Sequence, residues 1–396
     1  MPHKEHMDIL YFVQEFPKLS ESFVINEIHK LDSRGHDVSV FAIDEPEDEI
    51  SHSEFDNLDI PIRYAQIPSI TSLPELLSRE VLNSSVLRQA TFLERPISHA
   101  LWLHLGKQVA EFIEQLDGVD VVHAHFASQN RLAVTYAASY HSIPCTVTAH
   151  AYEIFTNDAR QVNRVCSRFD HVVVPSRYNQ QYLQNQVGIK TDISVVPATT
   201  NVSKFEPSSG CISGRLLTVA RLVEKKGYEY AIDAIAELVK QGYDIEYYII
   251  GKGEREEILR ERVRKHGIEE SVEFLGHVSD ERLMDELHMA ELFVLPCVVT
   301  ADGNRDITPV ALREAMATKT ACISTTISAI PEVITDGHDG LLVEPRNSEA
   351  LAESVATLLD DPERRQELAQ NARKTVETKF DISKSVDQLE EIFKSV

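Results

Sequence analysis

Cationic side chains gather in one short segment, Arg221-Leu-Val-Glu-Lys-Lys-Gly227, directly after the apolar run Arg215–Ala220. Lys226 lies five residues after Arg221, and a helix is expected to begin after Gly227. A guanidinium can hold one phosphate group with two hydrogen bonds, an ammonium can neutralise a second, and free amides at a helix start add positive potential. The segment therefore suits a diphosphate, although a solvated basic helix start would show the same pattern.

Two carboxylates flank the start of another expected helix, after the buried run Leu292–Cys297. Pro309 suits the first helical turn. Asp306 precedes this turn, and Glu314 lies about one and a half turns inside the helix. One carboxylate would then stand at the mouth of a cleft and the other along its wall, which suits two sets of sugar hydroxyls. As a lone spacing of two acids, the pattern often arises by chance.

Histidines cluster in the first half of the chain. His123 and His125 end one expected strand, and His150 ends the next. Three histidines can ligate zinc, but no cysteine or carboxylate completes the set at a recognisable spacing, so a metal is not expected. Because alternate strand residues face the same way, a buried and hydrogen-bonded position suits His123 or His125. His150, at the carboxyl end of its strand, is expected to point toward the cleft.

Two glycines, Gly251 and Gly253, stand between an expected strand and an expected helix. They resemble the start of a dinucleotide-binding fingerprint, but Glu256 occupies the place of the third glycine. A tight turn explains them as well as a nucleotide contact does.

Short apolar or β-branched runs, separated mostly by stretches of helical periodicity, are the elements that must position these residues. The runs predict strands at Asp8–Val13, Asp37–Ile43, Ile60–Ile67, Val119–Phe126, Cys145–His150, His171–Ser176, Ile193–Ala198, Arg215–Ala220, Ile245–Gly251, Val272–Val278, Leu292–Cys297, Ala321–Thr326 and Gly340–Pro345. Near-continuous apolar strands that alternate with helices indicate parallel sheets covered on both faces. The predicted fold class is α/β, with doubly wound parallel sheets.

Helical periodicity is clearest over Ser20–Leu31, with Ser20 as the expected N-cap and Gly35 as the stop. The segment Thr71–Leu116 is also expected to be helical and is apolar around Leu101–Leu105. Its apolar side chains suit packing or a surface for a partner or a bilayer.

The length of 396 residues and mass of 44.6 kDa favour two domains. Turn residues in Ala198–Gly214 indicate the linker. The predicted organisation is a Rossmann-like domain over 1–205, a second over 206–378, and a C-terminal helix over 379–396 that could pack back on the first domain. Two facing sheets would leave a cleft at the carboxyl ends of their strands.

Lysine and arginine number 39 against 63 aspartate and glutamate, a net charge of −24. Such a charge repels phosphate backbones, so nucleic acid is not an expected partner, and only a local patch would contact a membrane peripherally. Five scattered cysteines indicate a reduced compartment. The apolar runs are shorter than the roughly 20 residues of a membrane span, and no signal peptide is evident, so a cytoplasmic location is expected.

Five motifs of the second half follow one another in an order that resembles the C-terminal domain of the glycosyltransferase group 1 (GT4) family. They are Arg221 to Lys226, Gly251-Lys-Gly253, Phe274-Leu-Gly-His-Val278, Asp306 to Ala317 and Ile330-Pro-Glu-Val-Ile334. In the first half, Gln14–Phe23, His123–Phe126 and Thr148–Phe155 resemble members that build exopolysaccharide or colanic-acid-like glycans. The resemblance covers nearly the whole chain.

This resemblance implies a GT-B fold, in which an acceptor-binding domain and a nucleotide-sugar-binding domain face each other across a cleft. It implies a retaining hexosyltransferase that uses a nucleotide-diphosphate sugar, acts on a glycan or lipid-linked saccharide in cell-surface polysaccharide synthesis, and needs no metal or other cofactor. The location implied is the cytoplasm, with peripheral contact at the inner face of the membrane.

The resemblance also assigns roles. Arg221 and Lys226 would bind the donor diphosphate and Glu314 the ribose. Asp306 would contact the donor sugar, and His150 would lie near the anomeric centre. Ser20 would lie in a loop that faces the phosphate. The backbone at Gly251 and Val278 is the candidate binding site for the nucleotide base.

Some positions depart from the family pattern. Asp306 stands where glutamate is usual, and Ile307, Lys319 and Ser328-Ala329 stand where glycines are common. A catalytically silent GT-B scaffold subunit and a GT-B sugar-nucleotide epimerase are therefore the alternative functions.

Overall fold

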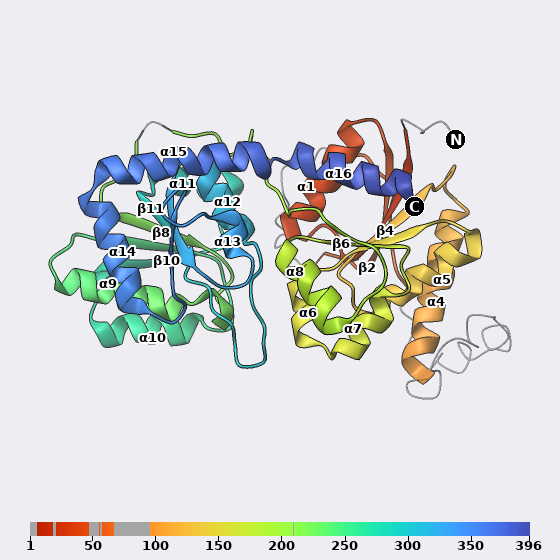
Figure 1. Cartoon of the computed structure of the whole chain (residues 1–396), viewed down its shortest axis with the longest axis horizontal. Coiled ribbons are helices and arrows are strands. Elements are labelled where there is room, and N and C mark those ends of the chain that lie inside the picture. Colours follow the sequence, from red (N-terminus) through yellow and green to blue (C-terminus); the bar gives the residue numbers. More distant parts are fainter. Residues whose placement is uncertain (1–5, 19–20, 47–54, 56–57, 67–95, 209) are drawn as a thin grey trace. The chain divides into compact units, whose positions relative to one another are not determined.

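The computed structural model describes residues 6–18, 21–46, 55, 58–66, 96–208 and 210–396. The chain forms two compact units (Figure 1). The first unit comprises Met1–Pro175, Gln180–Val196 and Val386–Val396, and the second comprises Ser176–Asn179 and Pro197–Ser385. Each unit has its own parallel sheet and its own hydrophobic core.

The first unit is built on a seven-stranded sheet with the order β3-β2-β1-β4-β5-β6-β7. All its neighbouring strands are parallel. The strands are β1 (Asp8–Glu15), β2 (Asp37–Asp44), β3 (Ile62–Tyr64), β4 (Val121–His125), β5 (Cys145–Thr148), β6 (His171–Val174) and β7 (Ile193–Val195). Each predicted strand of this half is present, most of them shorter than its apolar run.

Helices fill the crossovers that parallel strands require. They are α1 (Ser22–Ser33), α4 (Pro96–Ile113), α5 (Leu132–His141), α6 (Ala151–Thr156), α7 (Ala159–Cys166) and α8 (Arg177–Tyr182), which contributes to both units. The N-cap position of α1 is Glu21, held by an ion pair with Lys18 of 3.5 Å. The predicted N-cap at Ser20 is therefore wrong, and Ser20 itself lies outside the described residues.

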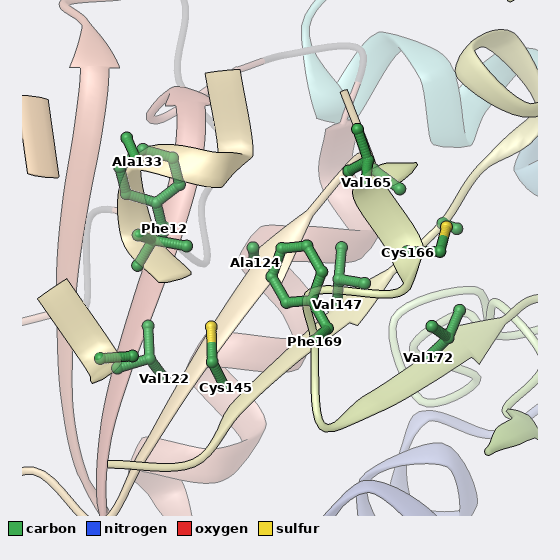
Figure 2. Packing of buried hydrophobic residues seen from close by; sticks show 14 of the residues in the cluster. Phe12, Val122, Ala124, Ala133, Cys145, Val147, Val165, Cys166, Phe169 and Val172 are labelled. Atoms are coloured by element: carbon green, nitrogen blue, oxygen red, sulfur yellow. The ribbon is translucent and has the colours of Figure 1, made fainter. Parts of the chain in front are cut away.

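The core of the first unit lies between its sheet and these helices. Figure 2 shows Phe12, Ala124 and Val147, from β1, β4 and β5, among residues of the helices and loops around them, including Ala133 and Val165. Their side chains are at most 1% exposed. Burial of a side chain as large as Phe12 contributes roughly 1.5–3 kcal/mol, so this sheet gives the strand ends a rigid support.

The second unit is built on a six-stranded sheet with the order β10-β9-β8-β11-β12-β13. Its strands are also parallel throughout. They are β8 (Arg215–Val219), β9 (Glu246–Ile250), β10 (Val272–Gly276), β11 (Leu292–Val294), β12 (Ala321–Thr325) and β13 (Leu341–Val343). The strands predicted for the second half are thus present as well.

Two hydrophobic clusters cover the faces of this second sheet. Its helices are α9 (Tyr228–Lys240), α10 (Glu256–His266), α11 (Asp280–Met289), α12 (Val310–Ala317), α13 (Ile330–Val333), α14 (Ser348–Asp360) and α15 (Pro362–Lys379). The pattern of apolar strands with helices on both faces confirms the predicted α/β class.

The strand order reverses once in each sheet. The reversal lies between β1 and β4 in the first unit and between β8 and β11 in the second. In open α/β sheets, ligands bind beyond the carboxyl ends of the strands at such a switch point. The candidate residues can therefore be sought at two defined edges.

The last helix, α16 (Ile382–Ser395), belongs to the first unit from Val386 onward. Arg34, the residue after α1, forms ion pairs of 2.8 Å with Asp387 and with Glu390, and the Phe393 ring lies 5.1 Å from that of His123. Among the described residues, no helix combines the length and the apolar character that a membrane crossing requires.

Candidate active site

The loop that follows β8 carries the three cations of the 221–226 segment. A 3-10 turn covers Glu224–Lys226, and α9 begins after Gly227. Gly227 has φ +70°, and a Cβ there would collide with the carbonyl oxygen of Pro296, which follows β11. The loop after β8 is therefore packed directly against the loop after β11, at the switch point of the second sheet.

Backbone hydrogen bonds hold the Arg221 loop in place. The Leu222 amide donates to the Lys252 carbonyl at 2.9 Å, and the Arg255 amide donates to the Leu222 carbonyl at 3.1 Å. The Arg221 side chain itself is exposed, and in the part of the chain that the structure describes its guanidinium has no hydrogen bond or ion pair. A fixed backbone with an open guanidinium suits an anion from solution.

Asp306 lies between the two lysines of the loop. Its Oδ2 is 2.5 Å from Lys226 Nζ, and its Oδ1 is 3.1 Å from Lys225 Nζ. The Cys297 thiol donates to the same Oδ2 at 3.4 Å. The sequence predicted the roles of Lys226 and Asp306 separately, and the structure joins them in one buried ion cluster.

Mutual attraction overrides burial in this cluster. Burial alone would raise the pKa of Asp306, but Lys226 and Lys225 hold it below its usual value. Burial alone would lower the pKa of Lys226, but the Asp306 carboxylate raises it. Both groups are therefore charged at neutral pH. Together with Asp306, the 221–226 loop contains three cations, Arg221, Lys225 and Lys226, against the two carboxylates Glu224 and Asp306, an excess of positive charge that a diphosphate would neutralise.

Glu314 lies half-buried on α12, which begins at Val310 directly after Pro309. The first turn of this helix has no side-chain cap, so its amides remain available to an anion. Arg313, the residue before Glu314, is fully buried, and its guanidinium nitrogens have no hydrogen-bond acceptor within the described ranges. Burial lowers the pKa of Arg313 to about 10.

The glycines of the Gly-Lys-Gly motif have a structural reason. A Cβ at Gly251, where φ is +134°, would collide with the carbonyl of Ala220, and a Cβ at Gly253 with that of Leu222. Both glycines thus allow the loop after β9 to approach the Arg221 loop. Val278 follows β10 and is half-buried against the second-unit core.

Two departures from the family pattern adopt the backbone conformation that glycine favours. Lys319 has φ +59° and Ser328 has φ +52°. A side chain with a Cβ is strained in this left-handed region. Ile307, by contrast, does not have a positive φ in this structure and lies buried.

A second cluster lies at the switch point of the first sheet, where β1 and β4 end. His125 Nε2 is 3.2 Å from Glu27 Oε1, and the same oxygen accepts the Tyr11 hydroxyl at 2.6 Å. On its other side, His125 Nδ1 is 3.1 Å from His150 Nε2. His123 instead bonds two threonines of β5, at 2.7 Å from Thr146 and 2.9 Å from Thr148.

The imidazoles of this cluster are neutral. Burial lowers the pKa of His123 and of His125 to about 3, with charge repulsion from neighbouring groups, and burial lowers that of His150 as well. Burial raises the pKa of Glu27, opposed by its neighbours His123 and Tyr11. The structure thus adds to His123 and His125 the carboxylate, Glu27, that the sequence did not reveal.

Glu27, His123 and His125 place one ligand atom each within 4.8 Å of one another, the proximity that a metal site needs. The same atoms, however, are engaged in the hydrogen bonds described above, and none of their side-chain atoms is among the buried groups without a partner. The cluster is therefore complete as a hydrogen-bonded network.

The backbone around His150 is also fixed. The Glu153 carboxylate accepts the amide of His150 at 2.6 Å and that of Ala127 at 2.9 Å. Phe126, the residue before Ala127, has φ +65°, a conformation in which a bulky residue is strained. The His150 ring lies 4.4 Å from the Phe126 ring and 4.9 Å from that of Phe23, measured between centroids.

Sequence reasoning missed Tyr11, Glu27, Lys225 and Cys297. Glu27 had a visible indication, because it stands among the apolar residues on the buried face of α1. A carboxylate in that position needs buried partners. Lys225 stands in the cationic segment of the sequence, but only the folded chain brings Lys225 and Cys297 to Asp306.

Comparison with known proteins covers both halves of the chain. The family described as Glycosyl transferases group 1 matches residues 213–375, and that described as Glycosyltransferase Family 4 matches residues 20–204. The chain is 28% identical to the putative colanic acid biosynthesis glycosyltransferase WcaL of Escherichia coli (strain K12), over 94% of this chain and 96% of the relative. It is 26% identical to the amylovoran biosynthesis glycosyltransferase AmsK of Erwinia amylovora, over 98% and 99%.

Among solved structures, HepE of Anabaena in complex with UDP and glucose is similar with a TM-score of 0.76 and 18% identity, over 99% of this chain and 100% of that one. A likeness at this identity supports the fold. The family matches, the related exopolysaccharide enzymes and the two parallel sheets agree with one another. The chain belongs to the glycosyltransferase group 1 (GT4) family and has the GT-B fold.

Proposed function

We propose that the protein is a retaining hexosyltransferase that moves a sugar from a nucleotide-diphosphate donor to a glycan or lipid-linked saccharide in cell-surface polysaccharide synthesis. The observation that carries this proposal is the pair of lysines, Lys225 and Lys226, on the carboxylate of Asp306, with Arg221 in the same loop, at the switch point of the second sheet. In a chain with a net charge of −24, such a local excess of cations suits a diphosphate.

In this proposal the donor binds to the 206–378 domain. Arg221 and Lys226 neutralise the diphosphate, with Lys225 as a third cation, and Glu314 holds the ribose hydroxyls. The backbone near Gly251 and Val278 receives the base. These roles agree with an exposed guanidinium, a half-buried carboxylate on α12 and uncapped amides at its start.

The chemistry needs charge stabilisation on the leaving group. As the bond from the anomeric carbon to the phosphate oxygen breaks, negative charge accumulates on the departing nucleoside diphosphate, and the preorganised cations stabilise it. The acceptor hydroxyl attacks the anomeric carbon and loses its proton to the departing phosphate oxygen. The diphosphate would compete with Asp306 for Lys226, which would free the carboxylate for hydroxyls of the donor sugar.

The 1–205 domain is proposed to bind the acceptor, with His150 near the anomeric centre and Ser20 in a loop facing the phosphate. We propose the cytoplasmic side of the membrane as the place of action, since the five cysteines are all free thiols, as in a reduced compartment.

UDP-sugars are the first donors to test, because HepE of Anabaena binds UDP and glucose. The decisive experiment is a thermal-shift series with UDP, GDP, ADP and their sugars, followed by transfer from labelled donor to saccharide acceptors. A ligand at 100 times its Kd stabilises the folded state by about 2.7 kcal/mol. Stabilisation by one nucleoside diphosphate and labelled product would support the proposal, and binding without product would favour a silent scaffold.

Metal independence has a separate test. Transfer should be unchanged after chelation with EDTA, because the three cations supply the positive charge that a metal would otherwise provide. A loss of activity that manganese restores would contradict this part of the proposal. Release of an isomerised donor sugar, instead of a glycosylated acceptor, would identify an epimerase.

A further inference from the structure

The hydrogen bonds of the first-unit cluster have a direction. Glu27 Oε1 accepts the Tyr11 hydroxyl at 2.6 Å, a length typical of an O–H group bonded to an ionised carboxylate. Burial and the Glu27 charge raise the pKa of Tyr11 well above its usual value, so Tyr11 keeps its proton. Glu27 is then an acceptor only.

This acceptor determines the protonation of the next ring. His125 is neutral and therefore carries one N–H, and its Nε2 faces Glu27 Oε1 at 3.2 Å. The proton must be on Nε2, since two acceptors would otherwise face each other. His125 Nδ1 then presents a lone pair, and His150 Nε2, 3.1 Å away, must be the donor.

We propose that Glu27 and His125 are positioning residues that hold His150 in its Nε2–H tautomer, so that His150 Nδ1 presents a lone pair to a hydroxyl of the bound sugar. The proposal rests on the proposed function in placing a sugar at His150. It goes beyond that function by assigning work to three residues, Tyr11, Glu27 and His125, that no sugar need touch.

Packing supports this assignment. The rings of Phe23 and Phe126 lie against His150, and the Glu153 carboxylate fixes its backbone, so the imidazole has a defined orientation. With orientation fixed by packing and Nε2 occupied by His125, the tautomer is the remaining variable. A histidine in the wrong tautomer offers an N–H where a lone pair is needed.

Other charged groups around the cluster are consistent with neutral rings. Arg131 donates from Nε to the His125 carbonyl at 2.7 Å, and its positive charge opposes protonation of His125 and of His150. Glu153 binds backbone amides, and Glu27 is engaged by Tyr11 and His125. Charge repulsion between His123 and His125 also lowers the pKa of His123, which opposes protonation of both rings at once.

The first test uses the unmodified full-length protein. Long-range ¹⁵N–¹H correlation spectra of ¹⁵N-histidine-labelled protein distinguish the two neutral tautomers and the imidazolium, and the His150→Gln variant identifies the His150 signals. We expect the Nε2–H pattern at pH 7.5. An Nδ1–H pattern or an imidazolium would overturn the proposal. This result does not depend on activity, so it is separate from the success of the transferase assay.

The second test compares His125→Asn with His125→Leu, two side chains of nearly equal size. The Asn carbonyl can accept from His150 Nε2, whereas Leu cannot. We expect His125→Leu to lower kcat roughly 10- to 100-fold, as losses of orienting partners do, with little change in KM. His125→Asn should recover most of the loss and keep the Nε2–H pattern. Equal kcat values in the two variants would contradict the proposal. Failure of both to fold would leave the wild-type spectrum to decide.

Discussion

At the scale of single residues, Arg221 and Lys226 have the same proposed ligand but different surroundings. Arg221 is exposed, and its guanidinium has no partner among the described side chains, whereas Lys226 is 2.5 Å from the buried Asp306. Removal of Arg221 should therefore affect only the ligand, and removal of Lys226 should also affect the fold. The two variants separate binding from stability.

Arg221→Ala should reduce kcat about 100-fold or more, because one preorganised charge on the leaving group is lost. The midpoint of thermal unfolding should stay unchanged, since the side chain forms no ion pair in the described structure. Transfer assays and thermal scans check the two parts. The matched control is Arg264→Ala, which removes an exposed arginine paired with Glu257 on α10 and should leave kcat unchanged. Equal activity of Arg221→Ala and the control would refute the phosphate role.

Lys226→Met should destabilise the second unit by about 1–3 kcal/mol, because it leaves the buried Asp306 carboxylate with Lys225 alone. Asp306→Asn in the same chain should restore part of this loss, since the unpaired charge disappears. Urea unfolding of the two single variants and the double variant measures the coupling. Additive free energies would show that the pair does not act as a unit.

The sequence predicts site residues where the residue type suits the chemistry and the position is near a strand end or a helix start. Arg221, Lys226, Asp306, Glu314 and His150 are predictions of this kind. The sequence does not give distances between residues that are far apart along the chain. Asp306 pairs with Lys226, and Glu27 contacts the histidines of β4, because the folded sheet brings their loops and helices together.

At the scale of elements, the strands were predictable because a parallel strand buried on both faces must be apolar along its length. The residues at which the strands end were less predictable. The predicted Cys145–His150 strand stops at Thr148, and His150 becomes the residue before α6. The amide of His150 donates to the Glu153 carboxylate and not to a neighbouring strand, so the sheet ends before His150. The pattern of apolar residues does not predict such a local hydrogen bond.

The turn between α12 and β12 offers a test of backbone strain. Lys319 has φ +59° and an exposed side chain. Lys319→Gly should raise the free energy of unfolding by roughly 0.5–1 kcal/mol, since relief of the left-handed strain exceeds the entropy that glycine gains in the unfolded chain. Lys319→Ala is the matched control, because it removes the same side chain but keeps the Cβ. Urea unfolding in which Ala stabilises as much as Gly would contradict the strain argument.

At the scale of the whole molecule, a net negative charge is compatible with the proposed binding of an anionic donor, because positive charge is concentrated locally. The net charge of −24 favours solubility, while the cationic loop after β8 is held by backbone contacts with the loops after β9 and β11. The two units have separate cores, so the stability of each can be measured by itself when a probe reports on one of them. Trp102, the chain's single tryptophan, packs against the core of the first unit and is such a probe.

Stability of the first unit should fall on acidification. His123 and His125 have folded pKa values of about 3, below the 6.5 of an unfolded chain, so the unfolded state binds more protons as the pH falls below 6.5. Each such histidine then costs about 1.4 kcal/mol between pH 7.5 and 5.5. Glu27 and Glu153 act in the opposite direction, because burial raises their pKa.

One variant can measure the contribution of a single histidine to this pH dependence of stability. His123→Gln removes a ring whose hydrogen bonds go to Thr146 and Thr148 and whose Nε2 lies 4.0 Å from Glu27 Oε1, and it removes no hydrogen bond of the chain from Glu27 through His125 to His150. Urea unfolding followed by Trp102 fluorescence at pH 7.5 and 5.5 should show a loss of stability smaller than that of the wild type by about 1.4 kcal/mol. An identical loss in the two proteins would mean that His123 takes up its proton in the folded state. The buried network around β4 would then be open to protons, and the fixed polarity from Tyr11 to His150 could not hold.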